Sequence, residues 1–166
     1  MSFQAEIRTL IGWRWSDGAT YDARLDYARQ WLDAQAAGAE AAWLTERQPL
    51  GNGQSVAFDL TYLVRDVLGD KLVTAFAGVN VLLLVNHAPD GGTLCVGGAE
   101  ADAWNAPFGA GPLMVAPDGA AMLVSRAAPW PVDHVCRSLH LAAAGGDVQY
   151  SLALLGMMSG PGSSGV

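Results

Sequence analysis

The sequence predicts a mainly β protein: an antiparallel β-sandwich or jelly roll, with one or two short helices near the N-terminal half. Three observations support this prediction. Short apolar runs recur from residue 42 onward, turn sequences rich in glycine, proline and aspartate separate them about every 8 to 12 residues, and no long helix intervenes. The length of 166 residues suits one well-buried core.

The N-terminal region combines a strand-like stretch with a helical one. In IGWRWS, Trp13 and Trp15 share one face and Arg14 lies on the other, so this segment can add to a sheet, its own or a neighbour's. Residues 16–41 are rich in alanine and carry apolar residues at helical spacing, which predicts a helix. These apolar residues are Tyr21, Leu25, Ala28 and Leu32.

The remaining elements follow from residue 42. The runs AWLTERQ and SVAFDL, joined by GNG at 51–53, predict a hairpin, and residues 61–70 predict a short helix. The segment 73–86, VTAFAGVNVLLLVN, is apolar on both faces, which suits a central strand covered on each side. Further short strands follow, around turns at 117–119 and 145–147.

These patterns divide the chain into three regions. We expect residues 1–41 to form an N-terminal strand and a helical arm or insertion that packs on the main domain. Residues 42–158 form the β-sandwich domain, and the glycine-rich and serine-rich residues 159–166 form a flexible tail.

Composition restricts the possible partners. Only 15% of the residues are charged, against roughly 25% in an ordinary soluble domain, so the low charge favours a homo-oligomer or another assembly that hides surface. A net charge of −7 argues against a nucleic-acid partner. The longest apolar run, 79–85, is far shorter than the roughly 20 residues that cross a bilayer, so we expect no membrane span.

The N-terminus lacks the features of a secretory signal, which predicts synthesis in a reducing cytoplasm. Cys95 and Cys136 lie in separate predicted strands, and we expect both to be free, buried thiols.

No motif predicts catalysis, a cofactor or a metal. Gly97 and Gly98 lack the spacing of a phosphate-binding loop, and Glu100 and Asp102 would repel an anion, so this stretch predicts a wide turn. The three histidines do not form a metal-ligand pattern, and no serine or cysteine has the surroundings of a nucleophile. The sequence therefore predicts a protein that is not an enzyme.

The six tryptophans are the most informative residues. A loop tryptophan can anchor an interface, stack on a sugar ring or cap the end of a sandwich core, and the sequence leaves all three open. The candidate interface residues are Trp13, Trp15, Trp31, Trp104, Pro107, Phe108 and Trp130.

The order of several motifs resembles that of small structural proteins of tailed bacteriophages. These motifs are GWRWSDGA, QSVAFDL, VNVLLLVN, TLCVGGAEADAWNAPFG, VAPDGAAMLVSR and VQYSLALLG. The resemblance covers about residues 42 to 156, with a weaker echo at 10 to 19. In that group an FDL strand and a short helix precede a strand that ends in asparagine, and an L-x-V-G-G-A strand and an APFG loop follow.

The resemblance implies a non-enzymatic virion protein with a β-sandwich fold, made in the host cytoplasm. Its expected role is capsid decoration (cement) or part of a head spike, and its expected partners are the phage capsid, other virion proteins or its own copies. The alternatives are a tail or fibre adaptor, a carbohydrate-binding jelly roll that uses Trp104 or Trp130, and a cupin-like metalloenzyme.

Overall fold

The structure is a computed structural model that describes residues 5–16, 20–31, 40–67, 70–109 and 111–159. The described residues form thirteen β-strands and no helix, so they also contain no helix that could span a membrane. The chain divides into two units, Met1–Ala37 and Gly38–Val166. Except for Ser159, the predicted tail lies outside the described residues.

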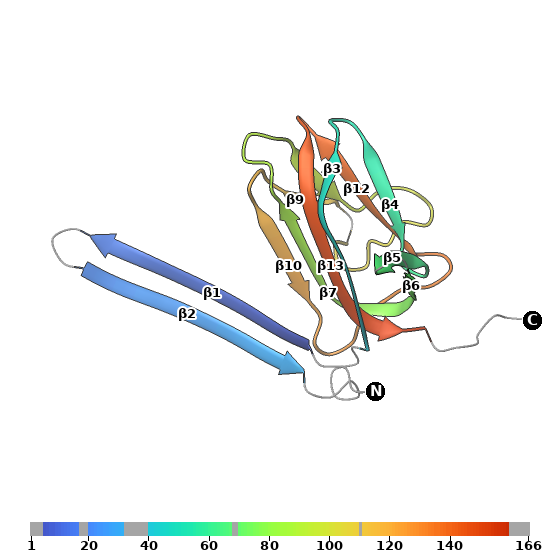
Figure 1. Cartoon of the computed structure of the whole chain (residues 1–166), viewed down its shortest axis with the longest axis horizontal. Helices are drawn as coiled ribbons and strands as arrows, with labels where there is room; N and C mark the ends of the chain where they lie inside the picture. Colours follow the sequence, from blue (N-terminus) through green and yellow to red (C-terminus); the bar gives the residue numbers. More distant parts are fainter. Residues whose placement is uncertain (1–4, 17–19, 32–39, 68–69, 110, 160–166) are drawn as a thin grey trace, which may run out of the picture. The chain divides into compact units, whose positions relative to one another are not determined.

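The second unit, which we call the sandwich unit, contains two antiparallel sheets (Figure 1). The first has the order β10-β7-β13-β3, and β11 also pairs with β7. Its strands are β3 (Ala41–Leu50), β7 (Phe76–Asn86), β10 (Ala120–Val124), β11 (Trp130–Pro131) and β13 (Val148–Met158). The second has the order β4-β12-β8-β9. Its strands are β4 (Ser55–Asp59), β8 (Thr93–Val96), β9 (Leu113–Val115) and β12 (Ser138–Ala144).

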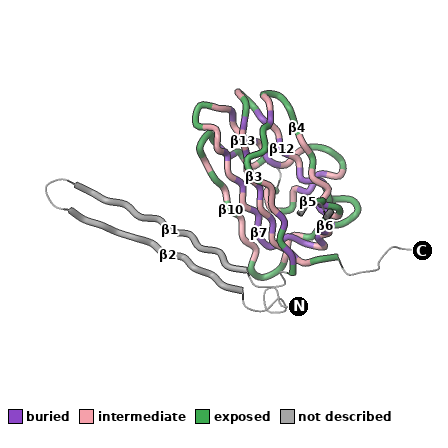
Figure 2. Tube along the Cα trace, in the orientation of Figure 1, coloured by how far each residue is buried: buried purple, intermediate pink, exposed green. Residues whose placement is uncertain are grey.

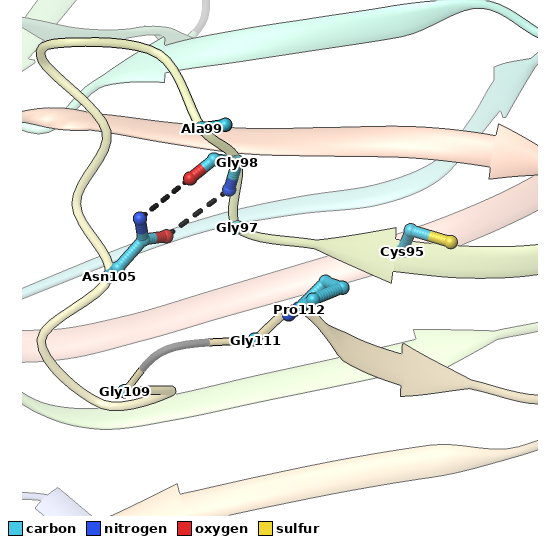
Figure 3. A pocket seen from close by; sticks show the side chains of 8 residues that line it. All are labelled: Cys95, Gly97, Gly98, Ala99, Asn105, Gly109, Gly111 and Pro112. Carbon is cyan, nitrogen blue, oxygen red and sulfur yellow. Dashed lines mark hydrogen bonds between the residues drawn. The ribbon is translucent and has the colours of Figure 1, made fainter.

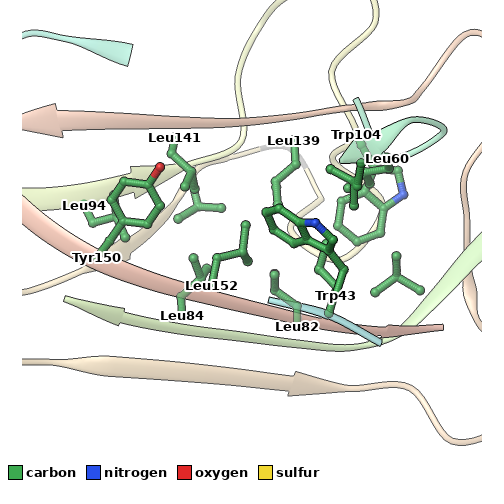
Figure 4. Packing of buried hydrophobic residues seen from close by; sticks show 14 of the residues in the cluster. Trp43, Leu60, Leu82, Leu84, Leu94, Trp104, Leu139, Leu141, Tyr150 and Leu152 are labelled. Carbon is green, nitrogen blue, oxygen red and sulfur yellow. The ribbon is translucent and has the colours of Figure 1, made fainter. Parts of the chain in front are cut away.

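The two sheets enclose one hydrophobic core, as in a β-sandwich. Leu139 and Leu141 of β12 face Leu82 of β7 and Leu152 of β13 across this core (Figure 4). Burial alternates along β13, as the pleat of a strand with one buried face requires (Figure 2). The mainly β, antiparallel fold predicted from the sequence is therefore confirmed.

The predicted hairpin at 42–60 is wrong, because its two strands belong to different sheets. β3 pairs with β13, whereas β4 pairs with β12. Trp43 of β3 and Phe58 of β4 instead meet across the core, with ring centroids 5.4 Å apart. Trp43 is buried and Phe58 is half-buried against the core, so the two strands meet face to face between the sheets.

The turn at 51–53 is a corner between the sheets, and it is braced by a second corner. The N–H of Asn52 donates to the Asp147 carboxylate (2.8 Å), and the N–H of Gly146 donates to the Asn52 side chain (3.2 Å). The Gly145-Gly146-Asp147 corner connects β12 of one sheet to β13 of the other. Asparagine and aspartate are therefore required here as hydrogen-bond acceptors as well as turn formers.

The segment predicted as a central strand is β7, which pairs with β13 on one side and with β10 and β11 on the other. Its pairing with β13 shifts register between Leu155 and Gly156. A Cβ on Gly156 would collide with the Gly78 carbonyl oxygen. Glycine at 156 therefore allows the two central strands to stay in contact through this irregularity.

The short helix predicted at 61–70 is wrong. Residues Leu63–Val67 form strand β5, which pairs with β6 (Asp70–Thr74) in a small antiparallel hairpin. Leu63 is buried, and the next residue, Val64, is 41% exposed opposite Val73. The β-branched valines of this segment favour a strand over a helix. A strand therefore occupies the place where the phage-like order of motifs has a short helix.

The first unit contains β1 (Ala5–Ser16) and β2 (Thr20–Trp31), which pair along their full length as a two-stranded antiparallel ribbon. We call it the N-terminal ribbon. The strand predicted around Trp13 and Trp15 is confirmed, and the helix predicted from residue 16 is wrong for residues 20–31. Apolar residues also recur at alternate positions of this stretch. The register with β1 places Tyr21 opposite Trp15 and Leu25 opposite Ile11. Residues 17–19 and 32–39 of the predicted helix lie outside the described residues.

The prediction for the cysteines is correct in one respect and wrong in the other. Both thiols are free, but Cys95 is half-buried and Cys136 is exposed. Cys136 follows the short strand β11 in an irregular segment that the sequence had assigned to a strand. An irregular surface segment does not bury its side chains as a central strand does.

Candidate functional site

The loop after β8 contains the glycine pair, and its polar groups bond to one another. The N–H of Gly97 donates to the His140 carbonyl (2.9 Å), and the N–H of Gly98 donates to the Asn105 side-chain oxygen (3.2 Å). The Asn105 amide in turn donates to the Gly98 carbonyl (2.7 Å) (Figure 3). Asn105 thus holds the start of the loop against its middle.

Gly97 must be glycine for two reasons. Its φ of +97° is in a region that residues with a side chain rarely adopt. A Cβ there would also lie 2.8 Å from the Asn105 side-chain oxygen. The glycine pair therefore shapes the backbone.

A hollow of about 360 Å³ lies beside this loop. Its lining residues are Cys95, Gly97, Gly98, Ala99, Asn105, Gly109, Gly111 and Pro112. None of them carries a charge, and the N–H groups of Gly97 and Gly98 are already bonded. The N–H groups of the glycine pair are therefore not free to bind a phosphate, and none of the eight lining residues supplies the cation that a phosphate site uses.

The two acids of the loop lie near one histidine. Nδ1 of His140 lies 3.8 Å from the Glu100 carboxylate and Nε2 lies 3.9 Å from that of Asp102, so both contacts become ion pairs when the ring is protonated. Within the described ranges, no three His, Cys, Asp or Glu side chains form a group that could hold a metal ion. Asp102 has a structural partner, since the Ser138 hydroxyl donates to it (2.6 Å).

This hydrogen bond has an electrostatic consequence. The Ser138 hydroxyl lowers the pKa of the Asp102 carboxyl below its usual value, and the charges on His140 and Arg137 act in the same direction. Partial burial of the carboxylate opposes them. The Asp102 carbonyl also accepts hydrogen bonds from the N–H groups of Arg137 and Ser138 (both 3.0 Å), so this residue anchors the start of β12.

Trp104 lies in the core, which is one of the three roles left open by the sequence. Its side chain is fully buried, and its indole N–H donates to the Pro131 carbonyl (2.7 Å). Phe108 packs edge-on against it, with ring centroids 6.1 Å apart. Trp104 therefore caps the sandwich and presents no surface to a second subunit or a sugar.

The other predicted interface residues are distributed over both units. Pro107, Phe108 and Trp130 are half-buried, and the last two pack against the core. Trp13, Trp15 and Trp31 occupy strand positions in the N-terminal ribbon. The seven residues therefore do not form one site within either unit.

The sandwich unit has an apolar surface that the sequence analysis did not single out. The register aligns two cross-strand rows on the side of the first sheet that faces away from the core. One row is Leu44, Ala153, Leu83 and Met122, and the other is Ala42, Leu155, Val81 and Val124. All eight are uncharged, and all except Val81 are half-buried or exposed. We call these eight residues the outer face.

A shallow groove of about 130 Å³ lies at the β3 side of the outer face. Leu44, Leu83 and Ala153 line it, and Glu46 is its one charged lining residue. The signal for this surface was present in the sequence, because residues 81–85 (VLLLV) are apolar at consecutive positions. That pattern predicts a strand with two covered faces, and the sandwich core covers one of them.

Comparisons of the chain with protein-family models, with curated proteins and with solved structures find no match. The resemblance to phage virion proteins is thus carried by the order of the motifs alone. What the protein does must be inferred from its own surfaces.

We predict that Trp104→Ala destabilises the sandwich unit by about 3–5 kcal/mol, because it leaves a cavity in the core. Trp104→Phe should cost less, since it loses the hydrogen bond to Pro131 but keeps most of the apolar volume. Chemical denaturation followed by circular dichroism measures both. Equal stability of Trp104→Ala and the wild type would contradict the buried position of this side chain.

We predict that Asp102 contributes to the loss of stability in acid. A carboxyl with a lowered pKa stabilises the fold above its unfolded pKa, and this contribution is lost as the pH falls through the folded value. The thermal midpoint of Asp102→Asn should therefore fall less than that of the wild type between about pH 5 and pH 2.5.

Asp133 provides a matched comparison, because the N–H groups of Cys136 and Val135 lower its pKa. Asp133→Asn should remove a separate part of the acid sensitivity, additive with that of Asp102. A wild-type pH profile in Asp102→Asn would show that the bond to Ser138 carries no such effect.

Proposed function

We propose that this chain is a non-enzymatic structural protein of a tailed-bacteriophage virion. In this proposal it is a capsid decoration (cement) or head-spike component that binds the capsid or its own copies. The observation that carries the proposal is the outer face, where two cross-strand rows of apolar residues lie on one side of the first sheet. The motif order described above supports the phage context.

The energetics of the outer face favour assembly. Each fully buried aliphatic side chain contributes roughly 1.5–3 kcal/mol relative to an exposed one, and seven of the eight residues still have solvent-exposed area to bury. Large contiguous apolar patches on soluble proteins usually mark interaction sites. A second surface placed against these rows would give β7 the second covered face that its sequence predicts, and would also cover the outer residues of β13.

The distribution of polar groups supports a structural role over a catalytic one. In the described loop 97–109, the side chain of Asn105 and the carboxylate of Asp102 are engaged in holding the backbone and the start of β12. Trp104 is buried, so its ring cannot serve as a stacking platform for a sugar.

We predict that Leu83→Lys weakens self-association or capsid binding at least about tenfold, or roughly 1.4 kcal/mol. Leu83 lies in the middle of the outer face, and an ammonium group there would have to be desolvated in the interface. Met114→Lys is the control, because Met114 is 62% exposed on β9 of the other sheet. Sedimentation velocity over a range of concentrations measures the effect. Equal association of the two variants would exclude the outer face as the interface.

The virion role is tested on particles of the phage whose genome encodes the chain. Peptide mass spectrometry of gradient-purified particles should find the chain in a fixed ratio to the major capsid protein, and cryo-EM should place it on the head. If the chain is absent from such particles, or sits on the tail instead, the proposed role fails.

A further inference from the structure

The corner between β3 and β4 contains the only Asn–Gly pair of the sequence, Asn52 and Gly53. Both residues are exposed. Asparagine is among the chemically labile side chains of proteins. Its side-chain carbonyl is attacked most readily when glycine follows, because no Cβ hinders the approach of the next peptide nitrogen. Asn52 is therefore the asparagine of this chain with the strongest intrinsic tendency to deamidate.

The fold requires both members of this pair. The N–H of Gln54 donates to the Gly51 carbonyl (2.9 Å), which closes a β-turn around them. The φ of Gly53 is +74°, as at the third position of a type II turn, where glycine is favoured. Asn52 supplies the side-chain oxygen that accepts the N–H of Gly146 (3.2 Å). The labile pair is thus a consequence of how the chain passes from one sheet to the other.

Hydrogen bonds of the corner hold the two groups that would react. The nitrogen of Gly53 donates its N–H to the Ala143 carbonyl (2.9 Å). The side-chain oxygen of Asn52 accepts from Gly146, and the Asn52 N–H donates to the Asp147 carboxylate (2.8 Å). The side chain and the backbone of Asn52 are therefore both fixed. Attack by the Gly53 nitrogen requires these bonds to break, which is a local opening of the structure.

We propose that Asn52 is a deamidation site that the closed corner protects and that reacts when the corner opens. The Gly53 nitrogen loses its proton and forms a bond to the side-chain carbonyl carbon of Asn52. The side-chain nitrogen takes up a proton and leaves as ammonia, which produces a cyclic imide. Water then adds to one of the two imide carbonyls, and the bond from that carbonyl to the ring nitrogen breaks. One direction of opening gives aspartate at residue 52, and the other gives isoaspartate.

Both products weaken the corner. Aspartate at residue 52 places a second carboxylate next to that of Asp147, which accepts the N–H of the same residue, and like charges repel. Isoaspartate adds a methylene group to the backbone, so the N–H groups of residues 52 and 53 no longer match the positions of Asp147 and Ala143. The turn at 51–53 then loses its connection to the corner between β12 and β13. The modified protein is therefore less stable than the unmodified one.

The first test compares the folded and the unfolded full-length chain. Wild-type protein is incubated at mildly alkaline pH with and without guanidinium chloride, and peptide mass spectrometry measures conversion of the amide at residue 52 to a carboxylate. In guanidinium chloride, Asn52 should react before the other asparagines. In the folded protein, its rate should be at least about tenfold lower. Equal rates in the two conditions, or an unmodified Asn52 in the unfolded chain, overturn the proposal.

The second test removes one hydrogen bond of the corner. Asp147→Ala deletes the carboxylate that accepts the Asn52 N–H, and it should raise the rate in the folded protein at least about threefold. Glu46→Ala is the control, because Glu46 is an exposed acid of β3 outside the β-turn, and its rate should equal that of the wild type. Circular dichroism at the incubation temperature confirms that both variants are folded. Equal rates of the two variants overturn the protective role of the corner.

The third test produces the aspartate product directly. Asn52→Asp should have a lower thermal midpoint than the wild type at neutral pH, and the difference should shrink in high salt, which screens the repulsion from Asp147. In an Asp147→Asn background, the same substitution should have a smaller effect, because the second carboxylate is gone. An equal effect in both backgrounds, or no effect in either, overturns the assigned repulsion.

Discussion

The structure of the sandwich unit depends on the pairing of β7 with β13 at the centre of the first sheet. These two strands carry core residues on one side, such as Leu82 and Leu152, and outer-face residues on the other, such as Leu83 and Ala153. Because a strand alternates its side chains, residues that build the core also determine which residues lie outside. Core formation and the outer face are therefore consequences of one register.

Short corners connect the two sheets and keep this register. β3 passes to β4, β7 to β8, β9 to β10 and β12 to β13 with a change of sheet each time. Asn86, at the end of β7, is fully buried, and its amide donates to the carbonyls of Gly92 (2.9 Å) and Ala116 (3.2 Å). One side chain thus ties the central strand to the segments around the second sheet, which compensates for burying its polar group.

The loop after β8 shows how far local chemistry can be predicted. Its sequence lacks the spacing of a phosphate loop, and the hydrogen bonds of Gly97 and Gly98 agree with a turn. Its tryptophan, however, had three possible roles, because an indole suits an interface, a sugar or a core equally well by composition. The tertiary structure assigns Trp104 to the core, where its ring is fully buried and its indole N–H donates to the Pro131 carbonyl, 27 residues away in the chain.

The sequence by itself determined the β class, the positions of the turns and the double-sided apolar character of β7, because alternation and turn chemistry are local properties. It did not determine whether a turn closes a hairpin or changes sheet, since that depends on which distant strand offers a partner. For residues 20–31, helical and strand periods were both present, and pairing with β1 along the full strand decided between them. The outer face likewise exists only in the tertiary structure, because its rows combine residues from four strands whose alignment no local pattern specifies.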